Sequence, residues 1–421
     1  MADTTCIIIG AGLMGVTAAH ALQARGFDVT LIDKASGPAM DTSFANAGML
    51  HPSMPAPWNG PGIGKHLAMS LFNPHAAMKL RLSAIPGLAG WGAKFLQYSS
   101  PKRHLAAAKA NYFLSAYSIL RTQAQRDALG LNFDSVDNGT LKIFGTQASF
   151  DTARHIGDSL AKFGLTHKPI TAAEAIAHEP ALADIKHRII GATYQPDDSI
   201  GDAYKFTCAL YDDFEHKGGH SRFECTVQNL IVKDGSCIGV ETDQGKMFAD
   251  HIVVAAGSFS RVIAKSAGVK LDIQPAKGYS ITVDTNGSAA LPKIAVIDEA
   301  MHCAITPLGD TLRVAGTAEF TGFNTALTSA RVKNLKLILG QTYPGIMPDL
   351  DLDNAKPWTG FRPMPADGVP YIGEANVSGL WINAGHGHLG WTMASGSAEL
   401  LASLMTYEPP PIDPEPYRVN R

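Results

Sequence analysis

The sequence predicts an α/β protein in which two domains alternate along the chain. Three observations lead to this fold class. The first part of the chain reads as strand, helix and strand around a glycine triplet, β-rich stretches follow a long helical region, and a late glycine-rich block again joins a buried strand to a helix. A length of 421 residues also exceeds one small domain, because domains average roughly 150 residues.

Residues 5–34 form the strand–helix–strand unit. Gly10, Gly12 and Gly15 have G-x-G-x-x-G spacing. The first glycine permits a tight turn, the second lets the backbone approach a pyrophosphate, and the third packs the helix against the strand. Asp33 ends the second strand, where an acid meets a ribose hydroxyl and disfavours a 2′-phosphate. We therefore expect a Rossmann-type dinucleotide site, and the motif leaves open whether the ligand is FAD or NAD.

The other elements are expected from apolar periodicity and turn residues. In order, we expect a polar stretch at 42–49, a Pro-rich loop at 51–61, a mainly helical region to about 130, strands at 139–144 and 191–195 around a helix at 150–163, and a helix at 202–217. There follow a hairpin turning at 233–235, a buried strand in DHIVVAAGSFS with residues 255–257 at its C-terminal end, and strands at 278–284, 302–308 and 311–320. The last elements are a helix at 329–339, a connector at 344–357, a loop at 358–373, a buried strand that begins at 380, a helix from near 391 and a Pro-rich tail at 408–421.

These elements alternate between two groups. We expect residues 1–55, 201–262 and 356–421 to form the Rossmann-type domain. Residues 56–200 and 263–355 are expected to form an α+β domain built on a mixed or antiparallel sheet.

The composition excludes several classes of protein. Lys and Arg number 35 against 38 Asp and Glu, and the net charge of −3 argues against a nucleic-acid binder. Five scattered cysteines without C-x-x-C spacing indicate neither a disulfide framework nor a metal site. The N-terminus does not read as a signal peptide, and no apolar run reaches the length of a membrane span. We expect a cytoplasmic protein. The apolar segment 60–96 is interpreted as a core or lid segment, with a membrane-surface helix as the alternative.

The C-terminal part holds the most specific candidate for ligand binding. Arg362 stands among prolines in WTGFRPMPADGVPYIG, and a buried arginine requires an anionic partner. A substrate is one candidate partner, and an internal Asp or Glu is the other. In LWINAGHGHLGWTMASGSA, a glycine turn leads into a helix whose N-terminus can receive negative charge.

The chain resembles the D-amino-acid oxidase-like flavoenzymes, and within them the bacterial D-amino-acid dehydrogenase group. The resemblance extends over nearly the whole chain. It rests on IIIGAGLMG, TSFANAGML, NGTLKIF, AAGSFS, PAKGYSIT, LRVAGTAEFTGF, the Arg362 segment and NAGHGHLGWTMASGSAEL, in this order.

The resemblance implies FAD rather than NAD, and makes the Rossmann-type domain the FAD-binding domain and the other the substrate domain. No cysteine stands in the segment where some members attach flavin, so we expect FAD to be non-covalent. We also expect no metal. The implied cofactor-binding residues are Gly10, Ala11, Gly12, Leu13, Met14, Gly15, Asp33, Lys34, Ser43, Asn46, Ala47, Gly48, Met49, Val227, Ala256, Gly257, Gly387, His388, Leu389, Gly390, Trp391 and Thr392.

The resemblance also implies a reaction. Arg362 matches the arginine of a G-x-R-P motif that grips the substrate carboxylate, and Tyr279, His388 and His51 are further catalytic candidates. We expect oxidative deamination of a D-amino acid to a 2-oxo acid and ammonia, by hydride transfer from Cα to flavin. The alternatives are oxidation of a cyclic D-imino acid such as D-proline or D-hydroxyproline, another amine oxidase or dehydrogenase of the family, an NAD-dependent dehydrogenase, and a non-catalytic FAD-binding subunit. A respiratory acceptor such as quinone, and with it contact with the inner membrane, are open expectations.

Overall fold

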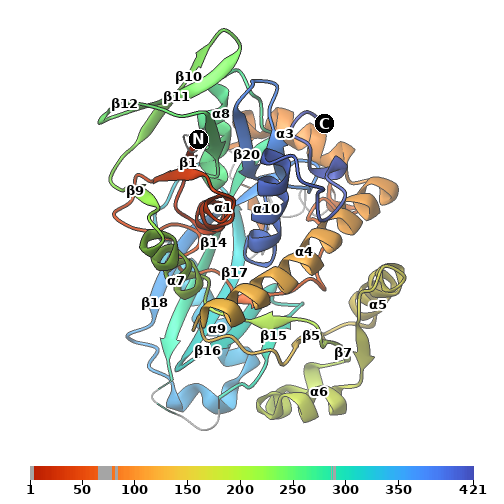
Figure 1. The fold of residues 1–421 in the computed structure, drawn as a ribbon. Helices are drawn as coiled ribbons and strands as arrows, with labels where there is room; N and C mark the ends of the chain where they lie inside the picture. The colour runs from red at the N-terminus through yellow and green to blue at the C-terminus, as the bar shows by residue number, and fades with distance from the viewer. Residues whose placement is uncertain (1–3, 65–77, 81–83, 286, 288–290) are drawn as a thin grey trace.

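The protein is built on two large sheets that share one central cavity. The computed structural model describes residues 4–64, 78–80, 84–285, 287 and 291–421. Within these residues the chain forms a six-stranded and a nine-stranded sheet, with helices packed against both. In Figure 1, β1, β20 and α10 lie in the upper half, whereas β5, β7, β15 and β16 lie in the lower half. This mixed α/β architecture confirms the predicted fold class.

The six-stranded sheet contains the predicted strand–helix–strand unit. Its central strand β1 pairs in parallel with β2 and β13, and β13 pairs in parallel with β20. In spatial order the strands are β19 (Tyr371–Glu374), β20 (Leu380–Ala384), β13 (His251–Val254), β1 (Thr5–Ile9), β2 (Asp28–Ile32) and β9 (His220–Arg222). A parallel sheet of this kind binds its ligand beyond the carboxyl ends of the strands, and the glycine triplet follows β1 at that edge.

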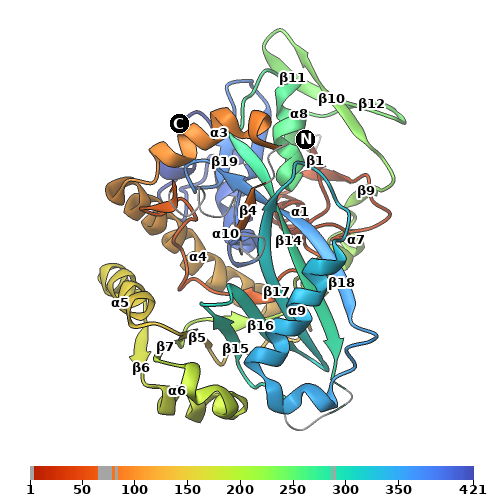
Figure 2. The ribbon, with the colours of Figure 1, turned by 180° about the vertical axis from the view of Figure 1, so that it is seen from behind.

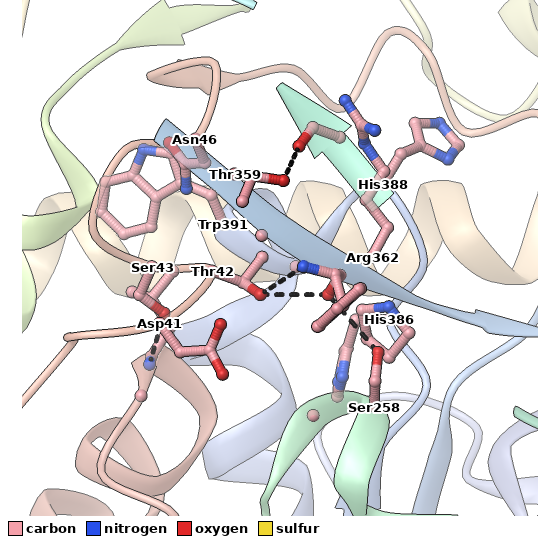
Figure 3. A pocket seen from close by; sticks show the side chains of 18 of the residues that line it. Asp41, Thr42, Ser43, Asn46, Ser258, Thr359, Arg362, His386, His388 and Trp391 are labelled. Carbon is pink, nitrogen blue, oxygen red and sulfur yellow. Dashed lines mark hydrogen bonds between the residues drawn. The ribbon is translucent and has the colours of Figure 1, made fainter. Parts of the chain in front are cut away.

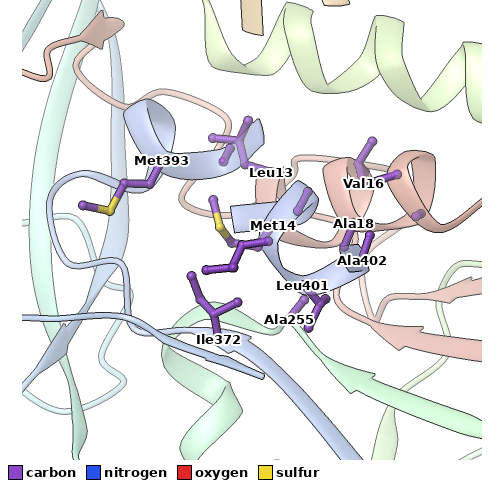
Figure 4. Close-up of a cluster of buried hydrophobic side chains, with 14 of the residues drawn as sticks. Leu13, Met14, Val16, Ala18, Ala255, Ile372, Met393, Leu401 and Ala402 are labelled. Carbon is purple, nitrogen blue, oxygen red and sulfur yellow. The ribbon is translucent and has the colours of Figure 1, made fainter. Parts of the chain in front are cut away.

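Three helices cover one face of this sheet. Helix α1 packs against both α10 and α7, and their apolar side chains form a continuous core (Figure 4). These helices are α1 (Leu13–Gln23), α7 (Ala203–His216) and α10 (Gly390–Met405). Small residues such as Ala18 and Ala402 let α1 and α10 approach closely, because neither adds a long side chain to the contact.

The opposite face is covered by a smaller sheet and a short helix. Strands β10 (Val227–Lys233) and β11 (Ser236–Thr242) form the predicted hairpin, which β12 (Gly245–Phe248) extends. Helix α8 (Ser260–Lys265) follows β13. Cys225, Val240 and Ala264 contribute to the apolar core on this side.

The nine-stranded sheet is mixed, as predicted, and Figure 2 shows its strands β14, β17 and β18 running alongside helix α9 (Ser329–Thr342). In spatial order its strands are β18 (Lys356–Pro365), β14 (Ile273–Asp284), β17 (Thr311–Phe320), β16 (Cys303–Leu308), β15 (Ala295–Asp298), β5 (Thr140–Phe144), β7 (Gly191–Gln195) and β6 (Lys168–Ile170), and β4 (Met78–Leu80) pairs with β17. The face that carries α9 is apolar, and Ile281, Val314 and Leu335 lie in its core.

A separate two-stranded sheet joins residues 199–200 to residues 49–50, where the polar stretch at 42–49 ends. Strand β3 (Met49–Leu50) pairs with β8 (Ser199–Ile200), and the helices α5 (Gln147–Ala161) and α6 (Ala172–His178) lie between β5 and β7 along the chain. Short 3-10 helices occupy 180–188, 257–259, 344–349 and 415–417.

The region predicted to be mainly helical contains α3 (Ile85–Gln97) and the long α4 (Pro101–Leu129), which ends where Gly130 takes a left-handed conformation with φ of 62°. The three-residue strand β4 also lies inside this region. Within the segment 60–96, residues 65–77 and 81–83 lie outside the described residues, so the interpretation of that part stays untested.

The prediction of a loop at 358–373 is wrong. Residues Lys356–Pro365 form β18, which lies at the edge of the nine-stranded sheet and pairs with β14. Its prolines suggested a loop because proline has no N–H for a sheet, but an edge strand tolerates proline where that N–H would face away from its neighbour. The tail is ordered, and Tyr417 is buried with its hydroxyl bonded to the Ala110 carbonyl.

The division into domains stays a proposal. The pairing of β18 leads us to place the last boundary near Pro365 rather than at residue 356, because β18 belongs to the nine-stranded sheet. We propose that the six-stranded sheet is the core of the cofactor domain and the nine-stranded sheet that of the substrate domain.

Candidate active site

A cavity of about 1750 Å³ lies between the two sheets. Its lining comes from the glycine turn after β1, from the loop at 40–49, from β14, β17 and β18, and from the turn before α10. Pockets for drug-sized ligands are typically about 300–1,000 Å³. The cavity therefore has room for a dinucleotide together with a small substrate. Figure 3 shows Asn46, Arg362 and His388 among the side chains that line it.

The glycine turn has the geometry that a pyrophosphate requires. Gly10 has φ of +108°, and a Cβ on Gly15 would lie 1.6 Å from the Gly10 carbonyl oxygen, so neither position accepts another residue without a shift. Gly12 begins α1 without a side chain to cap it, and Gly12, Leu13 and Met14 line the cavity. The positive end of the helix dipole therefore faces the space where phosphates would bind.

Asp33 lies beside this turn and also lines the cavity. Its Oδ2 accepts a hydrogen bond from the Ala11 N–H (2.7 Å), and its Oδ1 accepts one from the Ala35 N–H (2.8 Å). Each carboxylate oxygen can accept a further bond, because an ionised carboxylate has about four acceptor positions. Asp33 thus shapes the turn and remains able to accept from a ribose hydroxyl. These residues fit a dinucleotide.

The loop from Ser43 to Met49 is held between the two sheets. Ser43 Oγ accepts from the Leu13 N–H (3.1 Å) at the start of α1. The carbonyls of Ala45, Asn46 and Ala47 accept from Ser280 Oγ (2.6 Å), Arg313 Nη1 (3.0 Å) and Thr306 Oγ1 (2.8 Å) of the nine-stranded sheet. Gly48 has φ of +68°, which turns the chain into β3.

Further predicted cofactor residues lie around the same cavity. Lys34 Nζ is 3.8 Å from the ring centre of Phe259, and both line the cavity. Val227, Ala256 and Gly257 line it as well.

The turn before α10 provides a second helix N-terminus. Leu389 is the N-cap of α10 and provides no side-chain cap, and Gly387, Gly390 and Trp391 line the cavity. Leu389 itself and Thr392 are buried without lining it. Thr392 Oγ1 accepts from the His51 N–H (3.1 Å), so its contact is with the loop that carries His51.

Arg362 is a half-buried cation that lines the cavity. Its side chain crosses over β14 at Gly278, where a Cβ would lie 2.3 Å from Arg362 Nη1. Nη1 donates to the Thr317 carbonyl (3.1 Å), and among the described residues no carboxylate forms an ion pair with Arg362. Burial lowers the pKa of Arg362 to about 10, so the group stays charged at neutral pH. The internal acidic partner is therefore not found in the described part of the chain.

Three rings stand next to this guanidinium. Trp58 lies under Arg362, with the Cζ atom 5.5 Å from its ring centre, and the His388 ring stacks on Trp58 at 5.7 Å. His51 stacks on His388 at 6.4 Å. Burial lowers the pKa of His51 to about 4, and burial together with repulsion from Arg362 and from a protonated His51 lowers that of His388 to about 3. Both imidazoles are neutral at neutral pH and are poor bases.

Tyr279 lines the cavity, but its hydroxyl is engaged elsewhere. It donates to Glu319 Oε2 (3.0 Å) and lies 3.1 Å from Thr328 Oγ1. Burial raises the pKa of Tyr279, so the phenol is not a base at neutral pH.

The predicted residues thus converge, with four exceptions. Ala11, Gly15, Leu389 and Thr392 do not line the cavity and instead shape its turns. Trp58, Gly278 and Thr317 also lie at the site and were not predicted from the sequence. Trp58 stands in the loop at 51–61 that already contained His51, and Gly278 precedes the candidate Tyr279, so proximity was a usable signal for both.

The chain belongs to the family of FAD-dependent oxidoreductases, because the model of that family matches residues 5–404. Similar curated proteins are a D-amino acid dehydrogenase of Rhizobium johnstonii, 37% identical over 99% of both chains, and one of Vibrio cholerae, 34% identical over 96% of both. Membership in the family decides the choice between FAD and NAD in favour of FAD.

Solved structures share the fold. Glycine oxidase from Geobacillus kaustophilus superposes with a TM-score of 0.74 at 22% identity, covering 100% of this chain and 99% of that one. L-proline dehydrogenase from P. horikoshii gives 0.76 at 20% identity, covering 100% and 97%.

Neither a membrane-spanning helix nor a metal-binding cluster is present among the described residues. No helix there is long and apolar enough to cross a membrane. No group of three or more His, Cys, Asp or Glu side chains in the described ranges is arranged to hold a metal ion.

Proposed function

We propose that the protein is a D-amino-acid dehydrogenase that converts D-amino acids to 2-oxo acids and ammonia. The observation that carries the proposal is Arg362, a half-buried guanidinium that lines a large cavity without an acidic partner among the described residues. A buried charge needs a partner, and the carboxylate of an amino acid matches the planar fork of a guanidinium. The names of the similar curated proteins support the D-configuration.

The cofactor proposal follows from the cavity. FAD, when bound, supplies the two-electron oxidation by accepting a hydride from the substrate Cα. Gly10, Gly12 and the start of α1 would hold its pyrophosphate, and Asp33 its ribose. The N–H groups at the start of α10, near Gly390 and Trp391, would stabilise negative charge on the reduced ring.

The side chains of the cavity bind and orient the substrate. Arg362 would hold the carboxylate, and Trp58, His388 and His51 would form a dry wall beside it. Neither histidine is a strong base, so we propose that the substrate amine enters as the neutral amine after losing its proton to solvent. Loss of the hydride gives an imine, which water hydrolyses to the oxo acid and ammonia.

We also propose that FAD is bound non-covalently. Cys225 and Cys303 line the cavity, but burial raises the pKa of the Cys303 thiol and leaves it protonated. Acid precipitation should therefore release all the flavin into the supernatant. Flavin that stays with the precipitated protein contradicts this proposal.

The reaction is tested by anaerobic reduction of the bound flavin with a panel of D- and L-amino acids. The account predicts bleaching by D-amino acids and not by their L-enantiomers. Reduction by D-proline or D-hydroxyproline but not by D-alanine favours the cyclic imino acid alternative. Flavin that no amino acid or imino acid reduces favours a non-catalytic role. Readmission of oxygen or of a soluble quinone then tests the proposed respiratory acceptor, because the better acceptor reoxidises the flavin faster.

A further inference from the structure

Strand β17 has an irregularity directly beneath Arg362. On the neighbouring strand β14, Lys277 pairs with Glu319 and Tyr279 pairs with Gly316. The single residue between them on β14 therefore faces two residues on β17, which are Thr317 and Ala318. This is the arrangement of a β-bulge, and bulges commonly re-aim a side chain next to an active site.

Thr317 has an unusual backbone for its residue type. Its φ is +58°, in the left-handed region that favours glycine. A β-branched residue is a genuine outlier there, because its branched Cβ crowds the backbone. Such strain persists where the surrounding structure over-determines it, which is frequent at ligand sites.

The bulge places the Thr317 carbonyl against Arg362, where it accepts from Nη1 (3.1 Å). Thr317 lines the cavity and is 8% exposed, and its Oγ1 is buried without a hydrogen-bond partner among the described residues. A buried hydroxyl without a partner is unfavourable, because it loses its hydrogen bonds to water and gains none in return. The site therefore contains a buried donor with an unmet bond within the same residue that anchors the guanidinium.

We propose that Thr317 is a second substrate-binding residue, whose hydroxyl donates a hydrogen bond to the carboxylate that Arg362 holds. This inference rests on the proposed function. One of the five N–H groups of Arg362 binds the Thr317 carbonyl, which leaves donors for a carboxylate. A carboxylate accepts about four hydrogen bonds, so a hydroxyl can bind it in addition to a guanidinium. Thr317 thus holds the guanidinium in place with one group and extends the carboxylate site with the other.

The test is the binding of benzoate to the FAD-loaded protein. The change in flavin absorbance reports this binding without turnover. Benzoate is a monocarboxylate whose ring can lie against Trp58. Thr317→Val keeps the shape, the β-branching and the backbone requirement but removes the hydroxyl. Because hydrogen bonds to charged groups are the stronger ones, the Kd for benzoate should rise about 10- to 100-fold, and Thr317→Ser should restore it to within about threefold.

The matched control is Thr321→Val. Thr321 follows the same strand, and its Oγ1 is also buried without a partner, but it does not line the cavity. Its replacement should leave benzoate binding unchanged. The melting temperature and flavin content of Thr317→Val should match those of the unaltered protein. In this variant the KM for a D-amino acid and the Kd for benzoate should both rise.

Three results separate this inference from the proposed function. Unchanged benzoate binding in Thr317→Val, or equal losses in the Val and Ser variants, overturns the role of the hydroxyl. A protein that binds benzoate through Thr317 but whose flavin no D-amino acid reduces refutes the proposed function and supports the carboxylate site. An unaltered protein that binds no benzoate at all overturns both.

Discussion

The substitution Gly278→Ala should displace Arg362 without unfolding the protein. A Cβ at this position would lie 2.3 Å from Nη1 and 2.7 Å from Cζ of Arg362, whereas ordinary contacts begin near 3.4 Å. The guanidinium must therefore move by roughly 1 Å, and its 3.1 Å bond to the Thr317 carbonyl is lost. The backbone at this position can accommodate alanine without strain, because Gly278 is not among the residues with positive φ.

The expected cost falls on catalysis. A misplacement of about 1 Å in a positioning group costs on the order of 100-fold in rate, which is about 2.8 kcal/mol of transition-state binding. We expect kcat/KM for a D-amino acid to fall by about this factor, with unchanged flavin content and a melting temperature within a few degrees of the original. Steady-state kinetics with an artificial dye acceptor measures the loss.

A double-mutant cycle shows whether the loss acts through Arg362. In an Arg362→Leu background, Gly278→Ala should have little further effect, because the group that it displaces is already gone. Gly37→Ala is the control, since a Cβ at Gly37 meets no atom within 4 Å. Near-normal kcat/KM in Gly278→Ala, or additive losses in the cycle, would refute the reasoning.

Three further predictions concern the rings and the buried titratable groups. Trp58→Ala should weaken benzoate binding about tenfold while Trp58→Phe largely preserves it, because the ring wall is lost only in the first; equal Kd values for the two variants contradict this. Burial lowers the pKa values of His51, His386 and His388 to about 4, 3 and 3. Because the unfolded chain then binds more protons than the folded one below pH 6.5, the melting temperature of the holoenzyme should fall steadily as the pH drops from 6.5 to 4. A melting temperature that stays constant over this range contradicts the burial of these rings in their neutral form. Burial raises the pKa of Asp198 to about 7, so its ionisation increasingly destabilises the folded state as the pH rises from about 4 to 7. The free energy of unfolding of Asp198→Asn, measured by denaturant titration, should therefore increase relative to that of the original protein between pH 5 and pH 8. A difference in unfolding free energy that is the same at both pH values contradicts this.

Local patterns predicted the part of the site that is local in sequence. Gly10, Gly12, Gly15 and Asp33 lie within one strand–helix–strand unit, and the turn geometry follows from their spacing. Arg362 was also identified as a buried cation, because a lone arginine among apolar residues and prolines needs an anion. Its strand was missed, because edge-strand prolines and loop prolines look alike in a sequence.

Contacts between distant strands could not be predicted in the same way. Gly278 matters because Arg362 crosses it, and Thr317 matters because a bulge turns it toward the same guanidinium. Both depend on the pairing of β14 with β17 and β18, which joins segments far apart in the chain. A threonine with positive φ is likewise imposed by the sheet, since no local preference of threonine favours it.

The most direct test of the central claim is the anaerobic rate at which D-amino acids reduce the bound flavin in the original protein and in Arg362→Leu. We expect rapid bleaching by D-amino acids, none by the L-enantiomers, and a loss of several orders of magnitude in kcat/KM when the guanidinium is removed, while the flavin stays bound. Flavin that no D-amino acid reduces, or an Arg362→Leu variant that is reduced at the original rate, would contradict it.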